Sequence, residues 1–196
     1  MKTLPLIVLF FFGQCLYSQK GVIKKLAFST EILVPLATGN NFLNKGYNNP
    51  VALGLNLQVN KKKFFYEFLY QRADMNLADK KVIGNFNDAE LEVFLMCVGF
   101  RQKFANTSQF LEYRVGLGQV NLKSFSSFAN YTNTAVAYAV GCRYNKFLNN
   151  AFVVYGMIDF RYLAFATNDV GLQSGFYQNA YQIVPHLGVK VYLSNK

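Results

Sequence analysis

Ionisable side chains that could do chemistry recur at alternate positions along much of the chain, opposite large aliphatic residues. Proton transfer needs a carboxylate or an imidazole close to a partner, and covalent catalysis adds a nucleophile such as serine. His186 is the only histidine, and no serine lies near it in the surrounding pattern. The more distant serines in segments predicted to be loops are Ser124, Ser126, Ser127 and Ser174. The sequence therefore favours a non-enzymatic protein, and a lipid-modifying enzyme that uses His186 is the weaker alternative.

These alternating residues balance in charge, with four acids against four bases. An unpaired charge in a buried place is very costly, so residues that share a narrow interior must pair. We expect them to fill and close that interior, and the alternative is a gated polar pathway for a small solute. The predicted lumen charge network consists of Glu31, Glu67, Glu112, Arg114, Arg143, Asp159, Arg161, His186 and Lys190.

Metal and cofactor chemistry has little support in the sequence. The three cysteines are Cys15, Cys97 and Cys142, and they form no CxxC or Cys/His spacing. Such spacing is the usual signature of a metal site or a redox pair. We therefore expect no metal and no cofactor, and we expect Cys97 and Cys142 to remain thiols in strands that are not neighbours.

Eight segments with period-two alternation must position these side chains. This period is that of a strand with two different faces, and in one segment Leu53 and Leu55 alternate with Gly54 and Asn56. The predicted strands are 26–37, 51–60, 64–73, 89–102, 110–121, 134–144, 152–164 and 181–193.

The predicted connections alternate in length around the eight strands. Short turns fall at 60–63, 104–108 and 146–150, and longer loops at 38–49, 74–88, 122–133 and 165–180. This alternation is typical of outer-membrane barrels, in which the short turns and both termini are periplasmic. We predict an all-β chain that folds as an eight-stranded antiparallel up-and-down transmembrane β-barrel. An interior of that size is nearly filled by side chains, so a wide pore is not expected.

The first residues have the pattern of a secretory signal peptide. Lys2 precedes the apolar run 4–12, and a short polar stretch leads to Ser18 and Gln19. A charged start, a short apolar stretch and a small polar exit mark such a signal. We predict a cleaved signal over 1–19 and a barrel domain over 20–196, with lipid attachment at Cys15 as the alternative.

The last predicted strand carries a more specific pattern. It reads polar-x-Gly-x-x-apolar-x-apolar at His186, Gly188, Val191 and Leu193, and this resembles the C-terminal insertion signal read by the barrel-assembly machinery. The residues 194–196 that follow depart from relatives that end on an aromatic residue. The chain resembles the small OmpA/OmpX-type barrels and is similar to the porin-like "outer membrane protein beta-barrel" domains of Bacteroidetes, whose signals often end as Ser18-Gln19 does. The resemblance implies an integral outer-membrane protein of a Gram-negative cell.

Charge is distributed unevenly over the predicted barrel. The formal net charge is +10, with bases collected at the predicted periplasmic turns and acids at the predicted outer end. The basic ring could meet anionic phospholipid heads, be a solvated surface without a partner, or dock an acidic periplasmic protein. Nucleic acid is not an expected partner, because the bases sit in separate turns of a secreted chain.

The sequence leaves three functions open. The first is a binding or structural role for the outer loops or periplasmic turns, in which loop aromatics such as Phe42 and Tyr47 form an adhesive surface or merely pack at the membrane rim. The second is an accessory subunit of an envelope secretion or transport apparatus, and the third is the His186 enzyme. The expected partners are outer-membrane lipid, the barrel-assembly machinery during insertion, and an envelope protein.

Overall fold

Long antiparallel strands make up most of this computed structural model, which describes residues 25–48, 50–79, 86, 88–104, 108–126, 130–149, 151–166 and 178–193. The signal predicted at 1–19 lies outside these residues. Within them, no helix has both the length and the apolar character needed to cross a membrane. In chain order the elements are β1 (Lys25–Leu33), β2 (Leu36–Thr38), α2 (Phe42–Gly46), β3 (Ala52–Lys61), β4 (Phe64–Asn76), β5 (Asp88–Lys103), β6 (Gln109–Phe125), β7 (Asn130–Phe147), β8 (Phe152–Phe165) and β9 (Asn179–Leu193).

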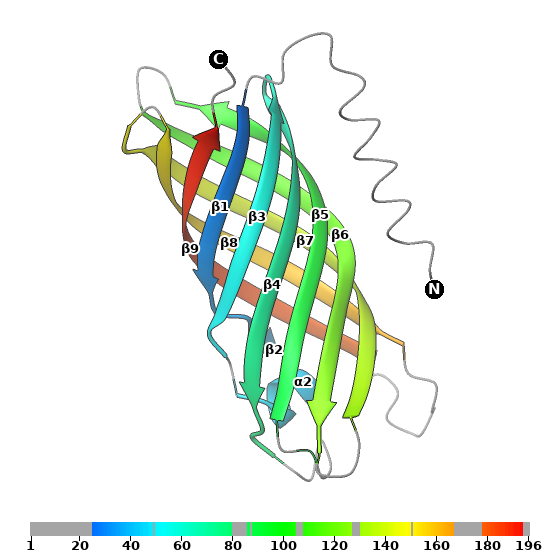
Figure 1. The fold of residues 1–196 in the computed structure, drawn as a ribbon. Coiled ribbons are helices and arrows are strands. Elements are labelled where there is room, and N and C mark those ends of the chain that lie inside the picture. Colours follow the sequence, from blue (N-terminus) through cyan, green and yellow to red (C-terminus); the bar gives the residue numbers. More distant parts are fainter. Residues whose placement is uncertain are drawn as a thin grey trace.

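The strands close on themselves into a barrel (Figure 1). Each long strand pairs with its neighbours in sequence, and β1 also pairs with β9, so that Phe28 lies opposite both Leu57 and Val191. Closure leaves none of the eight long strands with an unpaired edge. The predicted fold class, an all-β eight-stranded antiparallel barrel, is confirmed.

The first predicted strand is not continuous. The segment 26–37 divides into β1, which pairs with β3 and β9, and the short β2, which pairs with β9 alone. Val34 and Pro35 separate the two. Because Pro35 has no N–H to donate, it cannot continue a ladder on both sides of the strand. The prediction was wrong at this point because it followed the alternation and ignored the proline.

Several strands run further than predicted, and the largest extensions include those of β6 and β7. β6 was expected to end at residue 121 and β7 to begin at 134, but their ladder continues to a pairing of Phe125 with Asn130. The prediction took polar residues such as Lys123 and Thr132 as the start of a loop, although these two lie opposite each other in the ladder. A strand that has left the hydrocarbon layer needs no apolar outward face, so its hydropathy pattern changes while its hydrogen bonds persist.

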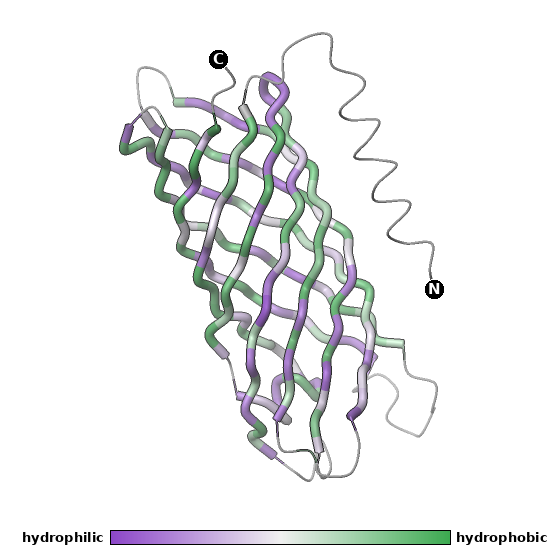
Figure 2. Tube along the Cα trace, in the orientation of Figure 1, coloured by the Kyte–Doolittle hydropathy of each residue, from purple (hydrophilic) through white to green (hydrophobic). Residues whose placement is uncertain are grey.

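Hydrophobic and hydrophilic residues alternate along much of the strands (Figure 2), so that the two faces of the wall differ. On β3, Leu53 and Leu55 point outward and are 67% and 48% exposed, while Ala52 and Asn56 point inward and are buried. An outward apolar band with a different inward face is the pattern of a transmembrane barrel. We call the end where β1 begins, β9 ends and the β3–β4 turn lies the turn end, and the opposite end, which carries α2, the loop end (Figure 1).

The helix α2, which the sequence did not predict, lies at the loop end. The side chain of Asn41 caps it by accepting a hydrogen bond from the backbone N–H of Asn44 at 3.0 Å, a role for which asparagine is well suited. Phe42, Leu43 and Tyr47 are buried. The expectation that Phe42 and Tyr47 form an adhesive surface, or pack at the membrane rim, is therefore wrong, because both belong to the interior.

Candidate functional site: the filled lumen

Nine ionisable side chains predicted for the lumen all point inward from the barrel wall. None is more than 3% exposed. They come from six of the long strands, and three lie opposite glycines: Arg114 opposite Gly99, and the acids Glu31 opposite Gly54 and Asp159 opposite Gly141. A Cβ at Gly54 would lie 2.6 Å from Glu31 Cγ. The glycines therefore provide the space in which these acids lie.

Glu112 is the centre of the network at the turn end. Its Oε2 accepts from Lys190 Nζ at 2.7 Å and from Arg143 Nη1 at 3.2 Å, and its Oε1 accepts from Arg101 Nη2 at 2.7 Å. Gln58 adds a fourth donor to this carboxylate, 2.9 Å from Oε1. One acid thus neutralises part of the charge of three bases, which are held at the narrow entrance to the lumen.

Glu67 and Asp159 extend the network toward the middle of the barrel. Glu67 accepts from Arg143 at 2.7 Å and from Arg114 at 2.5 Å. Arg114 also forms a two-point pair with Asp159, at 2.5 and 3.2 Å. Such fork-shaped pairs fix orientation as well as charge. Arg161 adds a further contact to Asp159 at 3.0 Å, so Asp159 is shared by two guanidinium groups.

His186 lies between two carboxylates where the network ends. Its Nδ1 is 3.1 Å from Glu31 Oε1 and its Nε2 is 3.3 Å from Asp159 Oδ2. Glu31 also accepts from Tyr155 Oη at 2.9 Å. The imidazole is 2% exposed, so it is sealed from bulk water and from substrate by its neighbours.

No described serine is placed to act with His186. Ser29, the one buried serine of this half of the lumen, lies opposite Lys190, whereas His186 lies opposite Leu33, four residues along β1. Four residues of a strand span about 13 Å, which is far beyond hydrogen-bond reach. Ser124, predicted in a loop, lies in β6, where its hydroxyl is 3.2 Å from Tyr47 Oη. Burial raises the pKa of that Tyr47 hydroxyl.

Several members of the network were missed by sequence reasoning. Arg101 was counted among the basic residues of the predicted periplasmic end and not in the lumen network. It is hydrogen-bonded to Glu112 and Asn60, and its guanidinium carbon lies 4.6 Å from the ring centroid of Phe110. Because both faces of the segment 89–102 are apolar, its pattern does not show which residues point into the lumen. The large aromatic Phe100, which faces outward, is the signal that would have placed its neighbour Arg101 on the inward face. Tyr155 and Gln58 were placed on the inward face without a role.

The other half of the lumen, toward the loop end, is apolar. Inward residues of β3 to β9 and α2 form one buried cluster there, in which the rings of Phe42 and Phe165 meet edge to face with centroids 5.0 Å apart. A smaller cluster of Ala27, Phe110, Val153 and Tyr192 lies at the turn end. Thus ion pairs fill one part of the lumen, and mainly hydrocarbon fills the rest, together with a few buried polar side chains such as Gln182 and Ser124.

The residues predicted as an assembly signal divide between the two faces of β9. His186 and Gly188 point inward, and a Cβ at Gly188 would meet the phenol ring of Tyr155. Val191 and Leu193 point outward, and Leu193 is 48% exposed. The pattern therefore coincides with packing needs of the folded barrel, and its role in assembly stays a prediction.

Metal ligation has no candidate among the described residues, because no group of three or more His, Cys, Asp or Glu side chains is arranged to hold an ion. Both described cysteines are thiols, Cys97 inside the lumen and Cys142 on the outer face. They are thus separated by the wall of the barrel.

Comparison with known proteins identifies the fold. No protein-family model and no curated protein matches the chain. Among solved structures it is similar to Neisserial surface protein A, with a TM-score of 0.67, 10% identity, and coverage of 85% of this chain and 96% of that one. OprG of Pseudomonas aeruginosa gives a TM-score of 0.59 at 10% identity, covering 88% and 97%, and Ail of Yersinia pestis gives 0.53 at 14%, covering 87% and 99%. The fold is that of these small outer-membrane barrels.

Proposed function

We propose that the chain is an integral outer-membrane barrel of the OmpA/OmpX type, without enzymatic activity, whose lumen is closed and whose function lies outside the membrane. The observation that carries this is the filling of the lumen. Nine ionisable side chains, each at most 3% exposed, are joined by ion pairs in one part of it, and a hydrocarbon cluster occupies the rest. Assignment to the Bacteroidetes group rests on sequence resemblance alone.

Outer-membrane location is supported by the lipid-compatible outer face. Large apolar side chains such as Leu187 (72%) and Phe160 (56%) are exposed all around the wall, and monomeric soluble proteins rarely expose apolar surface on this scale. We place the turn end, with both termini, in the periplasm by analogy with the general barrel plan. An epitope tag inserted at Lys62 should then be inaccessible to antibody on intact cells and accessible after permeabilisation. Antibody labelling of the tag on intact cells would show that the barrel has the opposite orientation.

An enzymatic role is disfavoured by the setting of His186, which is enclosed between Glu31 and Asp159 with no described serine in reach. We expect a His186→Gln strain to keep the lipid A and phospholipid profiles of the parent. A changed acylation pattern, with the folded barrel still present at normal amounts in the outer membrane, would support the alternative of a lipid-modifying enzyme.

The choice between a self-contained protein and an accessory subunit rests on what accompanies the barrel. We propose a self-contained role, because the eight long strands of the described barrel are paired on both sides and its interior is filled. A tagged copy purified from native outer membranes in mild detergent should therefore be recovered alone by mass spectrometry. A stoichiometric envelope partner that is lost from Lys62→Gln/Lys63→Gln, or from a variant altered in the loop 167–177, would instead establish the accessory role and its docking end.

A further inference from the structure

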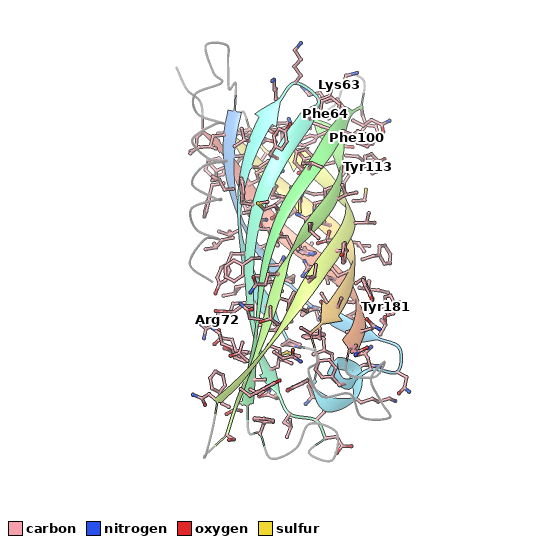
Figure 3. The ribbon with its side chains drawn as sticks, turned by 90° about the vertical axis from the view of Figure 1, so that its right-hand side faces the viewer. Lys63, Phe64, Arg72, Phe100, Tyr113 and Tyr181 are labelled. Carbon is pink, nitrogen blue, oxygen red and sulfur yellow. The ribbon has the colours of Figure 1, made fainter. Side chains whose placement is uncertain are left out.

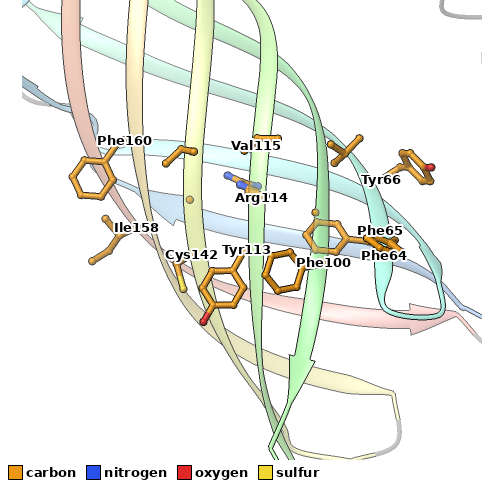
Figure 4. Close-up of a pocket in the computed structure, with 14 residues that line it drawn as sticks. Phe64, Phe65, Tyr66, Phe100, Tyr113, Arg114, Val115, Cys142, Ile158 and Phe160 are labelled. Carbon is orange, nitrogen blue, oxygen red and sulfur yellow. The ribbon is translucent and has the colours of Figure 1, made fainter.

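The outer wall is hollowed near the turn end, across β4 to β8 (Figure 4). The groove has a volume of about 810 Å³, within the range of roughly 300–1,000 Å³ found for ligand sites. Its outward lining is almost entirely hydrocarbon, including Tyr66, Val98, Val115, Val140 and Phe160. A membrane-facing concavity of this composition suits an acyl chain.

Two glycines on the floor account for the hollow. Gly99 and Gly141 point inward, where a Cβ would collide with Phe65 and with Asp159 respectively. Without those atoms the wall packs closely on the lumen at both positions. The large outward side chains that flank the two glycines enclose the depression on the lipid side.

Aromatic rings form the rim of the groove at the turn end. Phe64, Phe100 and Tyr113 lie in one register row across β4, β5 and β6, and Figure 3 shows them following one another below Lys63. The rings of Phe100 and Tyr113 are stacked, with centroids 4.8 Å apart. Aromatic residues at this level are typical of the membrane–water interface, so the rim marks where lipid headgroups begin.

Basic side chains lie just beyond this rim. Lys63 directly precedes Phe64, and Lys146 faces outward on β7 four residues beyond Cys142, which lines the groove. Both lysines are exposed. A lysine near a membrane surface can lay its alkyl stem along apolar surface and hold its ammonium among the headgroups.

No described carboxylate lies on this surface. Of the ten acids in the chain, four are in the lumen and Asp169 lies outside the described residues. The other five, all toward the loop end, are Asp74, Asp79, Asp88, Glu90 and Glu92. The exposed lysines at the turn end therefore present positive charge without a described exposed carboxylate near them, which favours an anionic group.

We propose that this groove binds one anionic phospholipid of the inner leaflet, with an acyl chain along the hollow of β4 to β8 and the phosphate between Lys63 and Lys146. The leaflet rests on the proposed orientation of the barrel. The site combines the shape, the apolar lining and the charge that such a lipid needs. A neutral lipid would fill the groove without using the lysines, and a second copy of the chain would bring its own lysines against them.

The test is native mass spectrometry of the folded full-length barrel in neutral detergent, titrated with dioleoyl phosphatidylglycerol or dioleoyl phosphatidylcholine. We expect one phosphatidylglycerol to bind in preference to phosphatidylcholine. Val140→Trp fills the groove and should abolish the preference, while Val136→Trp, on the same outward face of β7 but outside the groove, should keep it. Lys63→Gln/Lys146→Gln should weaken phosphatidylglycerol binding roughly tenfold or more, and Lys45→Gln at the loop end should not.

Three results would overturn the proposal. They are equal binding of the two lipids, binding unaffected by Val140→Trp, and a dimer that Val140→Trp dissociates, which would show that the groove receives a second copy. Heat-modifiable migration on gels verifies that each variant is folded. The lipid-binding assay measures neither conductance nor partner binding. A negative result would therefore leave the proposal of a closed lumen intact, and a positive result would be compatible with an open lumen. Binding of lipopolysaccharide instead, together with surface exposure of the Lys62 tag, would show that the orientation is wrong.

Discussion

At the scale of single residues, the barrel depends on charges that are stable only in pairs. Glu112 and Lys190, 2.7 Å apart, are both enclosed at the turn end of the lumen. A buried ion pair adds little net stability over a well-packed apolar pair, but removal of one partner leaves an uncompensated charge. The network therefore specifies which inward residues must occur together.

A double-mutant cycle on this pair tests that dependence. Glu112→Gln should lower the free energy of unfolding by about 3–5 kcal/mol, because Lys190 then loses its acid. Lys190→Met should cost less, because Arg101 and Arg143 still pair with Glu112, and the double variant should lose clearly less than the sum of the two. Urea unfolding in lipid vesicles, followed by fluorescence or gel mobility, measures all three. Two small and additive losses would mean that the two side chains act independently.

The glycines of the inner face provide a second test at this scale. A Cβ at Gly141 would collide with Asp159, which Arg114 holds in a two-point pair. Gly141→Ala should therefore cost about 1–3 kcal/mol. Gly156 faces lipid, and a Cβ there would have its nearest neighbour at 3.7 Å, so Gly156→Ala should be neutral in the same unfolding experiment. Equal effects of the two substitutions would contradict the close packing of the wall on Asp159.

At the scale of elements, the loop end is closed by a short helix that belongs to the core. Phe42 and Leu43 of α2 are buried among inward side chains of the strands, and the backbone oxygen of Gly46 accepts from Ala78 N–H at 2.8 Å. A five-residue helix has no stability of its own. The strand interior that it covers must hold it in place.

Phe42→Ala should release α2 without dismantling the barrel. Loss of a buried phenylalanine costs about 3–5 kcal/mol. We expect this loss to exceed the stabilisation that the remaining contacts of the five-residue helix α2 supply. We expect deuterium uptake of the segment 39–48 to accelerate while the strand amides stay protected, and Lys45→Ala, which is exposed on the same helix, to leave uptake unchanged. Unaltered protection of 39–48 in Phe42→Ala would show that α2 does not depend on this anchor.

The strands were predictable from the sequence because each has two chemically different faces, but their breaks and ends were not. Pro35 interrupts the first predicted strand although the alternation of residue types continues through it. The β6–β7 ladder extends beyond the pairing of Asn121 with Thr134, where the outward face becomes polar. The helix α2 was missed because five residues show no helical period. Its capping residue Asn41 was assigned to a loop rich in asparagine and aromatic residues.

At the scale of the whole molecule, charge distinguishes the two ends of the barrel, and side chains fill its described interior. The alternation of residue types along the eight strands was enough to predict which nine ionisable side chains point into the lumen. It could not tell which acid meets which base, because that depends on the register across the barrel, as when Arg114 of β6 pairs with Asp159 of β8. Arg101 was not predicted to point into the lumen, because its strand is apolar on both faces.

The proposed closed lumen is the central claim, and conductance of the purified, folded barrel in a planar lipid bilayer tests it most directly. Lys190, Asp159 and Leu163 are fully buried at successive levels of the lumen, which supports the proposal that side chains fill it. We predict a silent bilayer after verified insertion, with no steady single-channel steps across the applied voltages. Reproducible steps of uniform size, abolished when the barrel is omitted, would contradict a closed lumen and would favour the gated polar pathway.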